Sequence, residues 1–277
     1  MRMKYPFLIS VPHGGTQVPA VLKGRLALSK KEIHYYCDPT TREIFNFRHS
    51  VAAYIDTQVS RMAVDLNRPP LPLPGKDPDG IVKVRTIDGK DVYRPGKFPD
   101  MTTIHRLMME HYFPYHQRID ELIDTRAVKI AFDCHSMLPT GSCGQNDAGK
   151  DRPLICLGNN GDRRGRADKG SIATCPQDMV QALAEAFRET FAIQKEVAVN
   201  NPFSGGFIAN AHYWRKGVPW VQVEVNRSLY EDGDPGPRKH RAPDPVRIRQ
   251  LREQIWQALG LFWDRYEEEA KRGRAST

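Results

Sequence analysis

The stretch Val128-Lys-Ile-Ala-Phe-Asp-Cys-His-Ser136 decides the fold, because an apolar run leads directly into a cluster of polar side chains. The segment Val128–Phe132 has the length and composition of a buried strand, and His135 follows it. The segment Phe7–Val11 repeats the pattern, with His13 just beyond its end. In open α/β sheets, ligands bind at the carboxyl ends of the strands. We therefore expect both imidazoles at one edge of one sheet.

The rest of the chain alternates between strand-like and helix-like segments. We predict further strands at 62–66, 154–158 and 220–225, and helices from Asp38-Pro39 through Ala52, over 104–122 with a kink at Pro114, over 180–191, and from Asp244-Pro245 onward. Strands that alternate with helices predict an α/β fold with a largely parallel sheet. We expect one catalytic domain over residues 1–270, followed by a disordered polar tail at 271–277.

The stretch from 67 to 99 is rich in Pro, Gly and Asp, which predicts a long surface excursion. A small hairpin at Ile81–Arg85 and Asp91–Arg94 fits the turn sequence Asp88-Gly89 within it. Long loops of this kind often shape a binding pocket, so we expect this one to influence the choice of substrate.

Composition narrows the class of protein. The 277 residues are 40% hydrophobic and contain 41 basic and 33 acidic side chains, for a net charge of +8. That charge favours anionic partners, either small carboxylates or nucleic acid. The basic residues are scattered, with small clusters at Arg163–Arg166 and Arg238–Arg241, so a basic enzyme is favoured and nucleic acid disfavoured. The five cysteines form no CxxC pair, which predicts reduced thiols in a cytoplasmic protein. No apolar run is long enough for a signal sequence or a membrane span.

A third polar position lies on the strand predicted at 220–225. Its alternation places Gln222 and Glu224 on one face. Glu224 could act as a base or could pair with Arg227. The run 65–68, Asp-Leu-Asn-Arg, repeats this pattern of acid, apolar residue, Asn and Arg, so both runs could instead be mutual structural pairs.

Glycines mark two further candidate positions. The pair Gly14-Gly15 removes side-chain bulk beside His13, so a ligand or metal could approach the backbone there. The run 201–206, Asn-Pro-Phe-Ser-Gly-Gly, predicts a tight loop whose amides could face an anion or an oxyanion. The alternatives are a hydrogen-bonded turn histidine in the first case and an ordinary turn in the second.

Six short motifs occur in one order along the chain: Ser10-Val-Pro-His-Gly-Gly15, Tyr36-Cys-Asp-Pro39, Ser60-Arg-Met-Ala-Val-Asp-Leu-Asn-Arg68, Asp133-Cys-His-Ser136, Asn201-Pro-Phe-Ser-Gly-Gly206 and Gln222-Val-Glu-Val-Asn-Arg227. Together they resemble the N-formylglutamate amidohydrolase family over about residues 5 to 230. The resemblance implies a fold like that of zinc carboxypeptidases and aspartoacylases, with one three-layer α/β/α domain around a mixed sheet. It also implies a cytoplasmic enzyme of histidine catabolism.

The resemblance implies a zinc site, or a site for another divalent metal, in which two His and one acidic residue hold the ion. His13 and His135 match the two imidazole ligands, and Glu224 matches the general base. The carboxypeptidase pattern places the acidic ligand three residues after the first His, where this chain has Thr16. Asp38 is therefore our candidate for the third ligand, with helix capping before Pro39 as its alternative role, and Asp65 is the fallback.

The remaining candidate residues also follow from the resemblance. A small N-acyl amino acid carries carboxylates that arginines could bind, and we rank Arg61 first, with a catalytic role. The other expected substrate contacts are Arg68, Arg94, Asn201, Ser204, Gly205 and Arg227, and the expected supports of the metal ligands are Asp65, Asn67, Asp133 and Ser136.

Three alternatives stay open at this point. The same fold could serve a zinc carboxypeptidase or a deacylase for another N-acyl amino acid or peptide. The chain could instead be a non-catalytic anion- or nucleic-acid-binding protein, for which its two basic clusters would argue. A cysteine hydrolase using Cys134 beside His135 is disfavoured, because neighbouring residues at a strand end point apart. The sequence carries no signal for the oligomeric state.

Overall fold

A mixed β-sheet forms the centre of the molecule. The computed structural model of the chain describes residues 4–38, 40–72, 75–168, 170–193, 196–233, 236–237 and 243–275. Within these residues, six strands form one sheet in the order β2-β1-β3-β6-β4-β5. Their bounds are β1 (Tyr5–Val11), β2 (Val51–Asp56), β3 (Ile130–Met137), β4 (Ile155–Gly158), β5 (Val197–Val199) and β6 (Trp220–Asn226).

Strand direction changes once across the sheet. Strands β2, β1, β3 and β6 are parallel, β4 runs antiparallel to β6, and β5 runs parallel to β4. The register of β3 and β6 places His135 opposite Glu224, and that of β1 and β3 places Ser10 opposite Asp133. The parallel strands therefore bring their polar residues to one region of the sheet.

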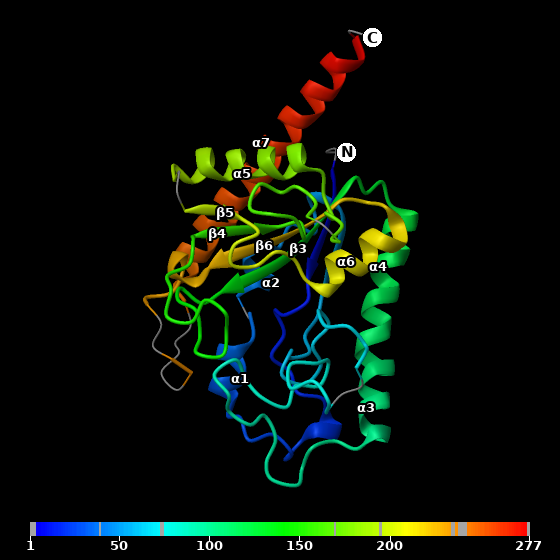
Figure 1. Cartoon of the computed structure of the whole chain (residues 1–277), viewed down its shortest axis with the longest axis vertical. Helices are drawn as coiled ribbons and strands as arrows, with labels where there is room; N and C mark the ends of the chain where they lie inside the picture. Colours follow the sequence, from blue (N-terminus) through cyan, green and yellow to red (C-terminus); the bar gives the residue numbers. More distant parts are fainter. Residues whose placement is uncertain are drawn as a thin grey trace.

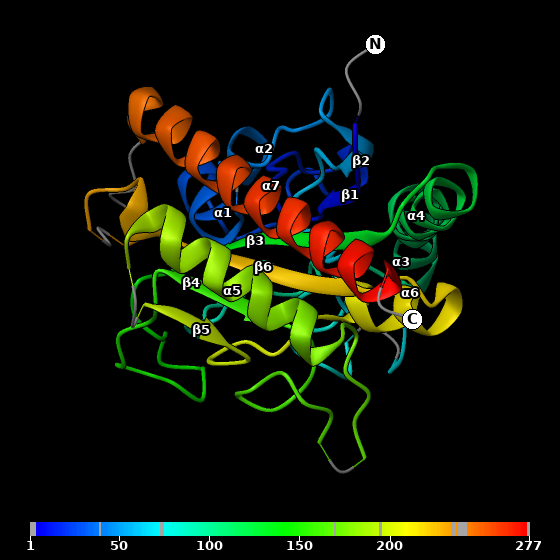
Figure 2. The same ribbon diagram turned by 90° about the horizontal axis from the view of Figure 1, so that it is seen from above.

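Helices cover both faces of the sheet (Figures 1 and 2). Their bounds are α1 (Lys30–Tyr36), α2 (Thr41–Ile44), α3 (Met101–Leu107), α4 (Phe113–Thr125), α5 (Gln177–Phe191), α6 (Phe207–Lys216) and α7 (Pro245–Ala275). Helices α2, α5 and α7 contribute to the core on one face, and α1, α3, α4 and α6 to the core on the other. The predicted three-layer α/β architecture is confirmed.

Pro114 lies at the start of α4, immediately after a single π-helical turn at Met108–Tyr112 that joins α3 to α4. A proline lacks the N–H that an uninterrupted α-helix would use, so the wider turn accommodates it. The long helix predicted over 104–122 is therefore present, and the π-helical turn interrupts it just before Pro114, where we predicted a kink.

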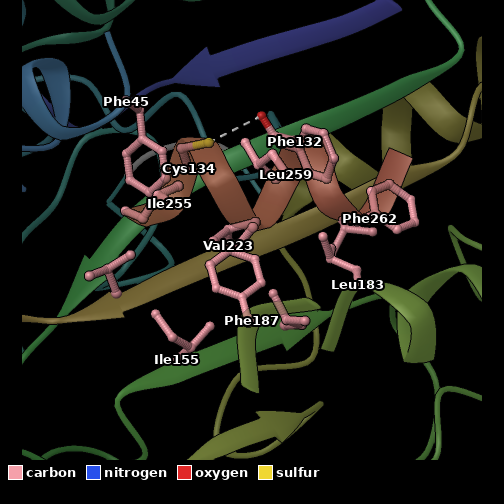
Figure 3. Packing of buried hydrophobic residues seen from close by; sticks show 14 of the residues in the cluster. Phe45, Phe132, Cys134, Ile155, Leu183, Phe187, Val223, Ile255, Leu259 and Phe262 are labelled. Carbon is pink, nitrogen blue, oxygen red and sulfur yellow. Dashed lines mark hydrogen bonds between the residues drawn. The ribbon is translucent and has the colours of Figure 1, made fainter. Parts of the chain in front are cut away.

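One of the two cores lies between the sheet and the α5–α7 layer (Figure 3). Helix α7 places Ile255, Leu259 and Phe262 over β3 and β6, while α5 packs beside it. This apolar contact fixes the sheet on the side opposite the polar residues of β3 and β6.

Truncation of Leu259, which is 2% exposed, tests this layer. Leu259→Ala is expected to lower the free energy of unfolding by about 2–5 kcal/mol, because it removes buried methyl groups and leaves a cavity. Urea unfolding followed by circular dichroism measures the change. The matched control is Met101→Ala, since Met101 is 52% exposed and its loss should change stability by less than about 0.5 kcal/mol. Equal effects of the two variants would contradict this view of the core.

Two predicted elements between residues 38 and 66 are wrong. Helix α2 ends at Ile44, and Val51 and Ala52, the end of the predicted helix, belong to strand β2 instead. Burial along β2 alternates with a period of two, as a strand requires, although the two alanines weaken that signal in the sequence. Residues 62–66 form turns instead of the predicted strand, because the buried Ser60 accepts the N–H of Met62 and bends the chain.

The stretch from 67 to 99 contains the hairpin turn at the predicted residues, but part of the stretch is buried instead of lying at the surface. Arg85 pairs with Asp91, and the N–H of Val92 donates to the carbonyl of Val84 at 2.9 Å. The surface location is correct for residues 94–97, which are exposed, and wrong for residues 81–83, which are buried. Their apolar members join the core on the α3–α4 side. The loop therefore forms an interior wall.

The C-terminal boundary also differs. Helix α7 continues to Ala275, past residue 270, where we expected a disordered tail to begin, and Figure 1 shows its end projecting beyond the layers. Ion pairs at i,i+4 spacing, Glu267 with Lys271 and Glu268 with Arg272, support this exposed end. In the described part of the chain, no helix combines the length and apolar character needed to cross a bilayer.

Candidate metal centre

Three side chains that could hold a metal ion converge at one point. His13 follows the end of β1, Asp38 follows α1, and His135 lies within β3. All three are buried, and one candidate ligand atom from each lies within 4.8 Å of the others. The two imidazole centroids are 4.7 Å apart. The two histidines thus lie together, as the strand-end argument predicted, and Asp38 joins them from the end of α1.

Both rings direct the same nitrogen, Nδ1, toward Asp38. Nδ1 of His13 and Nδ1 of His135 lie 3.6 and 3.3 Å from Oδ2 of Asp38. Nε2 of His13 lies 2.7 Å from Asp65, and Nε2 of His135 lies 3.0 Å from Asp133. A proton on each Nε2, donated to Asp65 or Asp133, would leave each Nδ1 with a lone pair for an ion beside Asp38. Metal-binding histidines usually have this arrangement.

The chemistry of the donor set fits a divalent cation. Nδ1 of His13 is buried and makes no hydrogen bond. Leaving a buried acceptor unpaired costs free energy, and a cation between the rings and Asp38 would remove that cost. Two imidazoles and one carboxylate form a typical three-ligand set for catalytic zinc, with one coordination position left for water or substrate.

Asp65, the fallback ligand, is placed differently from Asp38. Its Oδ1 accepts from His13, and its Oδ2 lies 3.0 Å from Arg61 and 2.8 Å from Lys83. Both oxygens are therefore engaged, and the one that contacts His13 meets the ring nitrogen that faces away from Asp38. Of the two carboxylates, only Asp38 belongs to the converging group.

Arg227 holds Asp38 in position. Its guanidinium donates to Oδ1 of Asp38 at 3.2 Å, to the carbonyl of Tyr35 at 2.8 Å, to Ser136 at 3.3 Å and to the carbonyl of Cys37. Four donors are thus occupied by protein acceptors, so the expected substrate contact of Arg227 does not match its environment. The side chain instead fixes the end of α1, and with it Asp38, beside the two histidines.

The expected capping role of Asp38 also differs from what the structure shows. Its carboxylate contacts His135 and Arg227, while only its main-chain carbonyl accepts from Thr41 at the start of α2. Pro39 lies outside the described residues. The carboxylate is therefore available to the cluster of histidines.

Glu224 lies beside these ligands on β6. It is buried, stands opposite His135 in the strand register, and accepts a 2.7 Å hydrogen bond from Nε2 of Gln222 on Oε1. The pKa of Glu224 is raised to about 7, mainly by burial and also by the nearby charge of Asp38, while His135 acts in the opposite direction. A carboxyl group with such a pKa can both take up and release a proton near neutral pH.

Residues 65–68 connect the centre to the surrounding elements. The amide of Asn67 donates to Asp133 at 2.9 Å and accepts from the N–H of Ile208 at 2.8 Å. A Cβ at Gly206 would come within 2.4 Å of the Asn67 amide nitrogen, so only glycine allows this approach of α6. Asn67 thereby ties a buried carboxylate to the start of a helix.

The mutual pairs that the two acid–Arg patterns suggested do not form. Arg68 donates to Asp79 and Arg227 donates to Asp38, whereas Asp65 pairs with other cations. Each arginine binds an acid from a distant segment, because the acid and the arginine of one pattern point into different surroundings. The sequence patterns alone do not reveal these partners.

A cavity of about 530 Å³ opens above the centre. His13, Asp38, His135 and Glu224 all contribute to its lining. Basic side chains surround them, and Lys83, Arg85 and Arg152 among these were not anticipated. Lys83 and Arg85 come from the stretch expected at the surface, and Arg152 lies in a loop without any motif, so no sequence signal pointed to them.

Some of the expected substrate contacts line this cavity and others do not. Those that line it are Arg61, Arg68, Gly205 and Arg227, whereas Arg94, Asn201 and Ser204 are not among its lining residues. Arg94 donates to the carbonyl of Leu26 instead. Arg68 is held by Asp79, while Nε of Arg61 is buried without a hydrogen-bond partner. Among these arginines, Arg61 combines a cavity position with an unused donor.

The role expected for Gly14 and Gly15 is wrong. A Cβ on Gly14 would come within 2.2 Å of the Arg42 side chain, and one on Gly15 within 2.1 Å of the Gln58 backbone. These glycines allow other parts of the chain to pack behind His13, so their small size serves chain packing and not the approach of a ligand.

The cysteine hydrolase alternative is also wrong. Cys134 belongs to the core under α7, where its Sγ faces the carbonyl of Phe132 at 3.6 Å, as the dashed line in Figure 3 shows. It therefore points to the face of the sheet opposite His135.

The two basic clusters were the argument for a nucleic-acid-binding protein. In the first cluster, Arg166 pairs with Asp162, and the second, 238–241, lies outside the described residues.

Comparisons with known proteins identify the family of this chain. A family model for N-formylglutamate amidohydrolase matches residues 5–231. The N-formylglutamate deformylase of Pseudomonas aeruginosa is 28% identical over 281 residues, which cover 95% of this chain and 96% of that protein. A solved N-formylglutamate amidohydrolase from Ralstonia eutropha JMP134 superposes with a TM-score of 0.69 at 18% identity, covering 98% of this chain and 95% of that one.

A solved gene product of Agrobacterium tumefaciens superposes with a TM-score of 0.64 at 20% identity, covering 96% of this chain and 90% of that one. The two superpositions establish a shared fold. The family model spans most of the chain, including the converging residues and Glu224. The chain therefore belongs to the N-formylglutamate amidohydrolase family, a family of enzymes that hydrolyse amide bonds.

Proposed function

We propose that this protein is a metal-dependent amidohydrolase that removes the N-formyl or N-acyl group of an acidic amino acid such as N-formyl-L-glutamate. His13, Asp38 and His135 hold a divalent ion, and Glu224 is the general base. The observation that carries this proposal is the convergence of two Nδ1 atoms and one carboxylate beside a buried Glu224, at one cavity. A bound Zn²⁺ would supply a Lewis acid that acidifies water and polarises the formyl carbonyl.

Glu224 moves the proton. Gln222 occupies Oε1, which fixes the carboxylate plane and leaves Oε2 to take a proton from the attacking water. The pKa of about 7 that burial gives this group allows it to return the proton to the leaving amine. Asp65 and Asp133 keep both imidazoles in the tautomer that presents Nδ1 to the ion.

Arg61 is the proposed contact for a substrate carboxylate. Arg61→Lys keeps a cation beside Asp65 but removes the unpaired Nε donor, so the KM for N-formyl-L-glutamate is expected to rise at least about 10-fold, as for a lost charge-assisted hydrogen bond. Steady-state kinetics measure this change, with Arg94→Lys as the matched control outside the cavity. An unchanged KM in Arg61→Lys would assign substrate recognition to another residue.

The direct test of the proposed function combines metal analysis with a substrate panel. The purified protein is expected to contain about one divalent ion per chain, in line with a single three-ligand site. It is also expected to hydrolyse N-formyl-L-glutamate faster than N-acetyl-L-aspartate or short peptides. Preference for a peptide would favour a carboxypeptidase, and preference for an acetyl substrate would favour another deacylase. Absence of both metal and hydrolysis would overturn the proposal.

A further inference from the structure

Lys83 is a buried cation close to the metal centre but outside its candidate ligands. Its side chain is only 2% exposed, although lysine is rarely buried unless it is paired. Nζ lies 2.8 Å from Oδ2 of Asp65 and also contacts the carboxylate of Asp79. Removing a charge from water is unfavourable, so the fold accepts this cost only because the two carboxylates surround it.

The backbone brings Lys83 to this place. The N–H of Asp65 donates to the carbonyl of Ile81 at 2.7 Å, which aligns residues 81–83 with the segment that carries Asp65. Lys83 thus arrives from the stretch that forms the cavity wall, while Asp65 arrives from the side of the histidines. One ion pair joins the wall to the centre.

The two histidines differ in the support that they receive. Asp133, which contacts His135, is held by neutral donors, the amide of Asn67 at 2.9 Å and the hydroxyl of Ser10 at 3.2 Å. Asp65, which contacts His13, accepts the main-chain N–H of Asn67 on Oδ1 at 2.9 Å and faces two cations at Oδ2. The contacts of Oδ2 of Asp65 are therefore charged, whereas those that hold Asp133 are neutral.

Each oxygen of Asp65 has a separate contact. Oδ1 faces Nε2 of His13, while Oδ2 receives Lys83 and Arg61. Rotation of the carboxylate would break both sets of contacts at once. Lys83 is the more deeply buried of the two cations, since the Arg61 side chain is 18% exposed. Lys83 therefore provides the more rigid anchor for Oδ2.

We propose that Lys83 is a positioning residue for the metal centre, which acts through Asp65 to hold the His13 ring with Nδ1 directed toward Asp38. Without Lys83, Oδ2 of Asp65 is held by Arg61 alone, and the single main-chain hydrogen bond from Asn67 to Oδ1 lets the carboxylate turn about that oxygen, which weakens its contact with Nε2 of His13. The ring then loses its fixed orientation and the ion loses a preorganised ligand. This inference rests on the metal site of the proposed function.

The test measures Zn²⁺ affinity of the metal-free protein by competition with a chromophoric chelator, without substrate. Lys83→Met is expected to weaken Zn²⁺ binding about 10- to 100-fold, the usual range for a residue that supports a ligand. Lys83→Arg, which keeps the charge, should recover part of that loss. The matched control is Lys90→Met, because Lys90 lies in the same hairpin but pairs with Glu32, away from the cavity.

A double-mutant cycle shows whether Lys83 acts through Asp65. Asp65→Asn should also weaken Zn²⁺ binding, and adding Lys83→Met to it should change the affinity by less than about twofold, since two residues that act in series do not add. Full additivity, or an unchanged affinity in Lys83→Met, would overturn the role of Lys83.

Two outcomes separate this inference from the proposed function. Wild-type protein that binds Zn²⁺ tightly while Lys83→Met binds it equally well would overturn only the role of Lys83. Wild-type protein that binds no Zn²⁺ would overturn the metal site itself. If Lys83→Met does not fold, Lys83→Gln, which keeps a donor toward the two carboxylates, provides the same comparison by the same measurement.

Discussion

Replacement of Glu224 with glutamine is expected to leave the metal content unchanged and to lower turnover of N-formyl-L-glutamate by at least about 100-fold, the usual scale of acid–base catalysis. Glutamine has the same shape and can still pair with Gln222, but its amide cannot accept a proton from water. Metal analysis and kcat at saturating substrate measure the two halves of this expectation. The loss should appear in kcat, because Glu224 is not one of the converging ligands.

Two companion variants make the result specific. Glu224→Asp keeps the acid but withdraws it from the reacting water, so its turnover should fall between those of the wild type and Glu224→Gln. Glu253→Gln alters an exposed glutamate on α7 and should behave as the wild type. Near-normal turnover of Glu224→Gln would remove Glu224 from the role of base.

Replacement of His13 with alanine is expected to reduce metal affinity by more than about 100-fold, beyond the range for supporting residues, because it removes one of three ligands. The remaining pair, Asp38 and His135, cannot close a three-ligand site. Equilibrium dialysis against zinc followed by elemental analysis provides the measurement. His49→Ala is the control, since His49 is exposed. Full occupancy in His13→Ala would exclude His13 as a ligand.

The strand-end argument reached much of the site from the sequence because it needed only local patterns. An apolar run followed by a histidine is visible at both Phe7–Val11 and Val128–Phe132, and parallel pairing of β1 with β3 brings the two ends together. Glu224 became visible in the same way, through the alternation of β6. Position in a strand is encoded locally, so these predictions did not depend on tertiary contacts.

The parts that sequence reasoning missed depend on contacts between distant segments. Lys83 lies in a loop whose composition suggested exposure, and only the partner carboxylates from Asp65 and Asp79 make its burial possible. Similarly, the partner of Arg227 is Asp38, which lies far away in the chain, and not the nearby Glu224. Such pairings have no local signature, because the residues between the partners can vary in number and type.

Short or alanine-containing elements were missed for a different reason. Strand β5 has three residues, Val197–Val199, too few for a period to be recognised. Helix α6 follows a glycine pair and has few buried residues, so its hydrophobic periodicity was too weak to separate it from the preceding loop. Tertiary packing, and not intrinsic propensity, stabilises both elements.

The run 65–68 has a consequence for how the length of this chain can change. Its four consecutive residues bond to four separate places: the His13 ring, His116 of α4 through the carbonyl of Leu66, Ile208 of α6, and Asp79. Insertion or deletion of one residue there would shift all four bonds out of register together. By contrast, a Cβ at Gly89 would meet nothing within 4 Å. Natural length variation should therefore concentrate at that hairpin tip and avoid the run 65–68.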